Sequence, residues 1–135
     1  MAFPFLDTNI FLRHLLQDHP DHSPSATAYL ERIERGELKV RTSEIVIFEI
    51  VFTLERTFKR SKSQIRENFL PLLKLPGTIL SGKRSFQKVF DYYVNLNISF
   101  ADAYHIVFME RLRLKEIITF DQGFDRATTI RRIEP

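Results

Sequence analysis

Phe3-Pro-Phe-Leu-Asp7 near the N-terminus and Ile117-Ile-Thr-Phe-Asp121 near the C-terminus are short apolar runs that each end at an aspartate. Runs of this length and composition are typical of buried β-strands. Pro4 makes the first run a poorer strand, because proline has no N–H to donate and fits only the first position of a strand. Each aspartate therefore follows directly after a predicted strand.

The rest of the chain alternates between helical and strand-like segments. Ser23-Pro24 and the capping-box spacing from Ser61 to Gln64 are helix starts, and Gly36 is a helix end. Pro71 should kink or split the helix that begins at Ser61. The sequence predicts helices over residues 9–16, 23–36, 44–58, 61 onward, 85–95 and 101–114, and strands over 3–6, 38–41, 78–80, 117–120 and 129–133.

Strands that are separated by helices pair in parallel, so this order predicts an α/β fold with a single open parallel sheet and helices on both faces. The 135 residues suffice for one domain, spanning 1–135, and are too few for two. Ligands bind such sheets beyond the carboxyl ends of the strands. Asp7 and Asp121 should therefore emerge on one acidic rim. Both also have a structural explanation, Asp7 as a helix N-cap and Asp121 as a turn residue.

The composition excludes several classes of protein. The chain has no cysteine, which excludes disulfides, zinc-thiolate sites and a cysteine nucleophile. A net charge of +3 and a pI of about 9.3 are compatible with a polyanionic partner. The N-terminus lacks the basic region of a signal peptide, and the longest apolar run, Ile45 to Leu54, is too short for a membrane span. We therefore expect a cytoplasmic protein that does not enter the membrane.

Glu49 lies within Ile45 to Leu54, where every other residue except Thr53 is apolar. A helix that is apolar on all sides is typically buried, so we expect the Glu49 carboxylate to be buried as well. A buried carboxylate must be neutralised, paired or bound to a metal ion. No basic residue lies three or four positions away to pair with it along the helix. A metal site is one explanation, and a salt bridge to a distant residue is the other.

Asp102 follows Ser99 by three residues, which is a capping-box spacing, and it begins a helix with an apolar body. It is therefore either a helix-capping residue or a site residue at the first turn of a buried helix. His105, one turn further, is either a metal ligand or a partly buried hydrogen-bonding residue. Asp125, four residues after Asp121, is either a fifth acid of the site or a surface partner of Arg126.

Four segments together resemble the signatures of PIN domains, in the right order and over essentially the whole chain. They are Phe-Leu-Asp7-Thr-Asn9 near the N-terminus, the lone glutamate Glu49 in its apolar helix, Ser-Phe-Ala-Asp102-Ala, and Ile-Thr-Phe-Asp121-Gln-Gly-Phe. In length and pattern the chain looks most like the toxin of VapBC-type toxin–antitoxin modules. The resemblance implies an endoribonuclease that binds RNA, a cognate antitoxin protein and a second copy of itself.

The resemblance also implies the roles of individual residues. It implies that Mg²⁺ or Mn²⁺ is held by four acids: Asp7, Glu49, Asp102 and Asp121. It further implies that Thr8 and Asn9 steady Asp7, that Thr119 lies beside the site, and that Asp125 helps to hold a second ion. The homodimer would form through the phenylalanine-rich helices that carry Phe52, Phe58 and Phe69.

Converging carboxylates repel one another unless a cation neutralises them, and Mg²⁺ is a hard ion that binds carboxylates, water and phosphate. Such an ion can activate water for an in-line displacement that leaves a 5′-phosphate and a 3′-hydroxyl. This chemistry needs no 2′-hydroxyl, so RNA rather than DNA is implied only by the resemblance. Basic residues beside the acids, with Arg13, Lys59 and Arg60 as candidates, would contact the RNA.

Other classes of protein fit the sequence less well. A receiver domain would need adjacent acids after the first strand, and a haloacid-dehalogenase-like phosphatase would need an aspartate where Asn9 stands. A DNA-directed nuclease of the same superfamily and a non-catalytic PIN-like module that binds RNA or a partner both remain open. A metal-dependent cleavage assay distinguishes the non-catalytic module from an enzyme.

Overall fold

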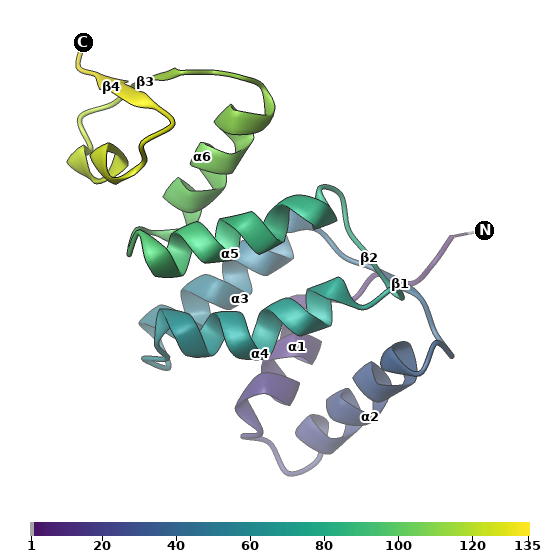
Figure 1. Cartoon of the computed structure of the whole chain (residues 1–135). Coiled ribbons are helices and arrows are strands. Elements are labelled where there is room, and N and C mark those ends of the chain that lie inside the picture. Colours follow the sequence, from purple (N-terminus) through teal and green to yellow (C-terminus); the bar gives the residue numbers. More distant parts are fainter. Residues whose placement is uncertain (1) are drawn as a thin grey trace. The chain divides into compact units, whose positions relative to one another are not determined.

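The computed structural model describes residues 2–135, and the chain divides into two compact units, residues 1–83 and 84–135 (Figure 1). The first unit contains α1 (Thr8–Leu16), α2 (His22–Glu34), β1 (Val40–Arg41), α3 (Glu44–Arg56), α4 (Lys62–Lys74) and β2 (Thr78–Ile79). The second contains α5 (Phe86–Asn95), α6 (Phe100–Arg111), β3 (Glu116–Ile118), the 3-10 helix η2 (Gln122–Arg126) and β4 (Arg131–Ile133). A short 3-10 helix, η1 (Lys83–Ser85), lies where the two units meet in the sequence. The single domain predicted for residues 1–135 stays a prediction.

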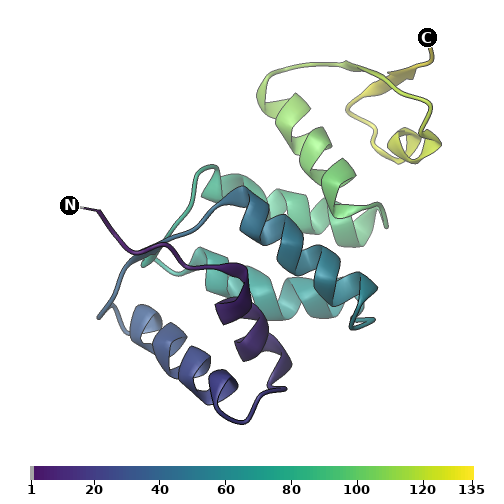
Figure 2. The same ribbon diagram turned by 180° about the vertical axis from the view of Figure 1, so that it is seen from behind.

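The strands of the first unit are parallel. β1 pairs with β2 in the register Val40 to Thr78, and the N-terminal segment bridges to the other side of β1 through Phe5 and Arg41. The Leu6 N–H donates to the Arg41 carbonyl, and the Arg41 N–H donates to the Pro4 carbonyl, both at 2.8 Å. Pro4 thus contributes only its carbonyl, as a residue without an N–H must. Figure 2 shows this N-terminal segment running past β1 into α1.

The core of the first unit lies among its four helices, with α1 packed against α2 and α3, and α3 against α4. Phe11 of α1 and Phe69 of α4 are fully buried and meet edge to face, with ring centroids 5.4 Å apart. α4 begins at the predicted capping box, in which Ser61 and Gln64 each accept from the other's backbone N–H. The helix continues without a break past Pro71 to Lys74.

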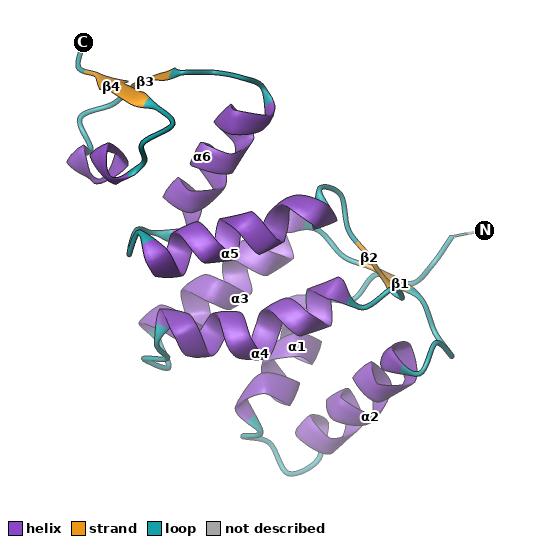
Figure 3. Ribbon diagram, viewed as in Figure 1, coloured by secondary structure: helices purple, strands orange, loops and turns teal. Residues whose placement is uncertain are grey.

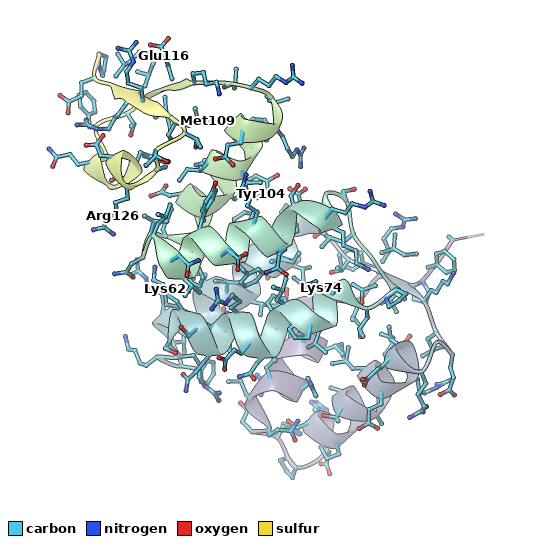
Figure 4. The ribbon with its side chains drawn as sticks, viewed as in Figure 1. Lys62, Lys74, Tyr104, Met109, Glu116 and Arg126 are labelled. Carbon is cyan, nitrogen blue, oxygen red and sulfur yellow. The ribbon has the colours of Figure 1, made fainter. Side chains whose placement is uncertain are left out.

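The second unit is built on the helices α5 and α6, which pack against each other. Phe86, Phe90 and Tyr93 of α5 surround Phe100 of α6, with ring centroids 4.9–6.5 Å apart. Arg126 of η2, labelled in Figure 4, donates to the carbonyls of Leu96 and Asn97 in the turn between the two helices. This contact fastens η2 to the helical part of its own unit.

The predicted parallel pairing is confirmed in both units, whereas a single sheet that contains all the strands is not. β1 pairs with β2, and β3 pairs with β4 in the register Ile117 to Arg132 (Figure 3). The strands are shorter than predicted, with two or three residues each, and the predicted strand at residues 3–6 is reduced to the Phe5 bridge. No helix within residues 2–135 is long and apolar enough to cross a membrane.

The predicted burial of Glu49 is wrong. α3 buries Val46, Ile47, Ile50, Val51 and Leu54, and the opposite side carries an exposed stripe. That stripe consists of Ile45, Glu49, Phe52 and Arg56. The apolar residues Ile45 and Phe52 are 69% and 62% exposed, so the apolar character of the helix does not imply burial on every side.

Candidate active site

Asp7 and Glu49 are joined through Thr8 in the first unit. The backbone N–H of Thr8 donates to Asp7 Oδ1 at 2.7 Å, and the Thr8 hydroxyl donates to Glu49 Oε2 at 2.9 Å. One residue therefore fixes two carboxylates that lie 42 positions apart in the sequence, at positions 7 and 49. The role of Thr8 in steadying Asp7, which the resemblance to PIN domains implied, stays a prediction. The contact of Thr8 with Glu49 was not predicted.

The local fold explains why Asp7 lies where it does. Asp7 is the N-cap of α1, with an extended backbone (φ −87°, ψ 167°), directly after the segment that bridges to β1. The buried Thr42 donates its hydroxyl to the Leu6 carbonyl at 3.0 Å and so holds this segment just before the acid. Sequence reasoning missed Thr42, since one threonine after a short strand carries no recognisable signal. Asp7 is therefore a helix N-cap in this structure. This capping role is compatible with a further role of Asp7 in a metal site.

Asp102 and Asp121 interact with each other in the second unit. Burial raises the pKa of the Asp102 carboxyl, a hydrogen bond with Ser99 opposes this, and the charge of Asp121 raises the pKa further. The net direction is upward, as expected for two acids that share one site. Ser99, and not Asp102, is the N-cap of α6, because its hydroxyl accepts from the Asp102 N–H at 3.1 Å. The capping contact itself uses the Asp102 backbone N–H, while the Asp102 carboxylate interacts with the Ser99 side chain and with Asp121.

The turn after β3 holds Asp121 in place. The Asp121 N–H donates to the Thr119 hydroxyl at 3.0 Å, and Asp121 Oδ1 accepts from the Gly123 N–H at 2.8 Å. A Cβ at position 123 would lie 3.0 Å from Asp121 Oδ1, so the absent side chain of Gly123 leaves space for this close approach. Thr119 therefore lies beside Asp121. Asp121 is thus also a turn residue, through the contact of its Oδ1 with the Gly123 N–H. The second carboxylate oxygen of Asp121 takes no part in this turn contact.

Asp125 has a different partner from the one considered on the sequence. Its carboxylate pairs with Arg132 Nε at 3.2 Å, and not with Arg126, whose guanidinium binds the carbonyls of residues 96 and 97. The parallel pairing of β3 with β4 brings Arg132 to this position. An arginine partner lowers the need of Asp125 for a metal ion, so its role as a metal ligand stays a prediction.

The three basic residues predicted to contact RNA all lie in the first unit. Arg13 pairs with Asp18 at 2.8 Å, with both side chains about a third exposed (30% and 35%). Lys59 is exposed in the loop after α3, in a left-handed conformation (φ 53°), and Arg60 is half-buried beside it. Asn9, predicted to steady Asp7, makes no hydrogen bond to it within residues 2–135, whereas Thr8 does.

The chemistry of the acids fits a hard divalent cation. Each unit contains two carboxylates held by neighbouring hydroxyl and N–H groups, and the donors are oxygens only, as Mg²⁺ and Mn²⁺ prefer. The raised pKa of Asp102 beside Asp121 indicates charge that a cation would relieve. In the described part of the chain, no three acidic or histidine residues come together as one metal-binding group. His105 is exposed one turn from Asp102, and its charge acts to lower the pKa of that acid.

Two comparisons with known proteins bear on these residues. A family model described as the PIN domain matches residues 5–129. The match begins two residues before Asp7 and continues past Asp121, so it includes all the acids described above. A search of the curated proteins returned no match to this chain.

Proposed function

Because the chain belongs to the PIN domain family, we propose that it is a metal-dependent endoribonuclease in which Asp7, Glu49, Asp102 and Asp121 hold Mg²⁺ or Mn²⁺. PIN domains are generally nucleases with nucleic acid substrates, and they generally use divalent metals. The observation that carries the proposal is the presence of two supported carboxylate pairs, one in each unit, at the four acids of the sequence signatures.

Each of the chain's own residues has a distinct part in this proposal. The four carboxylates supply the negative charge that binds the cation, and Thr8 orients two of them with its N–H and its hydroxyl. Thr119 and Gly123 orient Asp121. When bound, the metal ion would stabilise negative charge on the phosphate and lower the pKa of a water molecule.

The substrate would be held by positive charge close to these acids. Arg13, Lys59 and Arg60 are the proposed contacts to the phosphodiester backbone, which supplies most of the affinity in such complexes. Asp125 is proposed as an additional ligand to a second ion. We further propose that the protein is the toxin of a toxin–antitoxin module, a cytoplasmic homodimer that a cognate antitoxin protein binds.

The test is cleavage of end-labelled structured RNA, with single-stranded and duplex DNA of the same sequence alongside. We expect cleavage of RNA with Mg²⁺ or Mn²⁺, none in excess EDTA, and products that carry a 5′-phosphate and a 3′-hydroxyl. Cleavage that persists in EDTA would contradict the metal mechanism. Preference for DNA would instead identify a DNA-directed nuclease, and metal-dependent binding without cleavage would identify a non-catalytic module.

A further inference from the structure

A cavity of about 650 Å³ opens in the first unit between α1, α2 and the segment that precedes Asp7. Four of the residues that line it are apolar: Phe5, Leu6, Ile10 and Ala26. The polar lining residues come from α1, α2 and the loop between them: Asn9, Arg13, His19, His22, Ser25 and Tyr29. A volume of this size is typical of sites for small organic ligands, and a lining that mixes apolar and polar side chains is typical as well.

The charge of the lining favours an anionic ligand. None of the residues that line the cavity is an aspartate or a glutamate, while Arg13 contributes a permanent positive charge. Arg13 donates to Asp18 through Nη1, at 2.8 Å. The other N–H donors of its planar guanidinium are left for a ligand. Guanidinium groups bind phosphate through parallel N–H donors.

Two imidazole rings among the lining residues are stacked on each other. His19 and His22 are stacked, with centroids 4.0 Å apart and planes inclined by 9°. The Nδ1 of His19 accepts the backbone N–H groups of Asp21 and His22, at 3.2 and 2.9 Å. The Nε2 of His19 takes no part in these contacts and is left for a ligand. His22 is exposed and offers the open face of the stack, and a planar heterocycle can extend such a stack.

The position of the cavity links it to the acids. Phe5, Leu6 and Asn9 all line it, and Asp7 lies between them in the sequence. The side chains of Asn9 and Tyr29 make no hydrogen bond within residues 2–135, so an amide and a hydroxyl are available to the edge of a base. The ligand class that combines a planar heterocycle, polar edges and a phosphate is a nucleotide.

We propose that this cavity binds one nucleotide of the substrate, with its base against His22 and Tyr29 and its phosphate at Arg13. The inference rests on the proposed nuclease function and extends it, because it assigns a base-binding subsite to residues that flank Asp7 in the sequence. Stacking on aromatic side chains tolerates every base, whereas the edge contacts of Asn9 would add a preference among them.

The test measures binding of small probes to the full-length, metal-free protein, so that cleavage plays no part. 5′-AMP, adenosine and inorganic phosphate are titrated separately, and the imidazole signals of His19 and His22 are followed by NMR. 5′-AMP should shift both signals and bind more tightly than adenosine or phosphate. Arg13→Gln should weaken 5′-AMP binding about tenfold and leave adenosine binding unchanged, and His22→Ala should weaken both nucleoside and nucleotide by a similar factor.

Arg35→Gln is the matched control, because Arg35 is also an ion-paired arginine of the first unit, at 2.6 Å from Glu37, and does not line the cavity. Equal weakening by Arg13→Gln and Arg35→Gln, or no shift of the imidazole signals by 5′-AMP at millimolar concentration, would overturn the proposal. Displacement of 5′-AMP is also attempted with an oligoglutamate peptide, and tighter binding of that peptide than of 5′-AMP would assign the cavity to a protein partner instead.

A kinetic measurement separates this inference from the nuclease proposal. If the cavity holds a nucleotide of the substrate, His22→Ala should raise KM for RNA cleavage and leave kcat unchanged. Cleavage by His22→Ala with an unchanged KM would contradict the nucleotide subsite and leave the nuclease proposal intact. Binding of 5′-AMP as described, without any cleavage of RNA, would defeat the nuclease function and leave the nucleotide site.

Discussion

At the N-terminal end of α6, Asp102 lies in the first turn beside Asp121, whereas at the C-terminal end Glu110 is surrounded by donors. Lys88 approaches Glu110 Oε1 at 2.6 Å, and the hydroxyls of Tyr92 and Thr129 donate to Oε2 at 2.8 and 2.6 Å. Burial raises the pKa of Asp102, and the neighbouring acid raises it further. Burial acts in the same direction on Glu110, but the three donors outweigh it and lower the pKa.

The difference between the two ends of α6 separates a structural acid from a candidate functional one. The charge of Glu110 is matched by donors of the same unit, so Glu110 needs no ligand. Its contacts with Lys88 and Tyr92 connect α5 to α6, and its contact with Thr129 connects the segment before β4 to α6. Asp102 faces another carboxylate, a placement that costs stability unless a cation or a proton is bound. Perturbed acids of this kind are typical of functional sites.

The largest expected effect is on catalysis. Asp102→Asn removes one charge of the proposed metal site and should reduce RNA cleavage by on the order of a hundredfold to a thousandfold. Asp7→Asn should have an effect of the same size, because Asp7 is another of the four acids proposed to bind the metal. Single-turnover cleavage with saturating Mg²⁺ measures both.

Glu110→Gln and Glu67→Gln are the matched controls, because both substitutions remove a carboxylate that is outside the proposed site. Glu67 is an exposed residue of α4. Each should keep the wild-type cleavage rate once the folded fraction is taken into account. Loss of activity in Glu110→Gln beyond its loss of folded protein would mean that the two ends of α6 do not differ in the way proposed.

The second effect is on stability near neutral pH without metal. Glu110→Ala removes three charge-assisted or neutral hydrogen bonds and should lower the free energy of unfolding by about 2–3 kcal/mol. Asp102→Asn should leave it unchanged or raise it, because the charge repulsion falls while the N-cap contact, which uses the Asp102 N–H, remains. Urea denaturation in EDTA gives both values. A loss of about 1 kcal/mol or more in Asp102→Asn would show that its carboxylate is structural.

A third effect concerns the response to the ion. Mg²⁺ at roughly ten to a hundred times its Kd should stabilise the wild type by about 1–3 kcal/mol, because it binds the folded state. Glu110→Gln should gain as much as the wild type, whereas Asp102→Asn should gain markedly less. Thermal melts with EDTA and with Mg²⁺ measure the gain, and an undiminished gain in Asp102→Asn would remove that residue from the proposed site.

The local signals in the sequence predicted most of the helices. Ser61 and Gln64 form their capping box, and the boundaries of α3, α5 and α6 agree with the predicted helices to within a few residues. α2 begins at His22, one residue before the predicted Ser23 cap. The reason is that the His19 ring accepts the N–H groups of Asp21 and His22, a role that a histidine rarely signals in a sequence.

The errors concern contacts that depend on tertiary structure. The apolar residues of α3 occur on every side of the helix, so their periodicity does not indicate which side packs against the core. For this reason Glu49 was predicted to be buried, although it lies on the exposed stripe with Ile45 and Phe52. The pairing of Asp125 with Arg132 depends on the register of β3 and β4, which no local signal gives. Strand lengths were overestimated because apolar runs indicate burial, and not the extent of hydrogen-bonded pairing.

The smallest expected effect is the pH dependence of stability, in which the two ends of α6 should have opposite signs. The folded-state pKa of Asp102 is raised above its ordinary value of 3.8, so its contribution to stability is present below that value and is lost as the pH rises through the folded pKa. The pKa of Glu110 is lowered from 4.5, so its contribution is present above 4.5 and is lost as the pH falls through the folded pKa.

Relative to the wild type, Asp102→Asn should therefore become more stable as the pH rises from the acidic range toward neutrality. Glu110→Gln should be less stable than the wild type at neutral pH, and this deficit should shrink on acidification. Both changes should stay within about 1 kcal/mol, because the two side chains are partly solvated. Urea denaturation in EDTA, repeated at several pH values, measures the two differences. Slopes of the same sign for both variants would mean that Asp102 is as well compensated as Glu110, and would remove the electrostatic reason for placing a cation beside it.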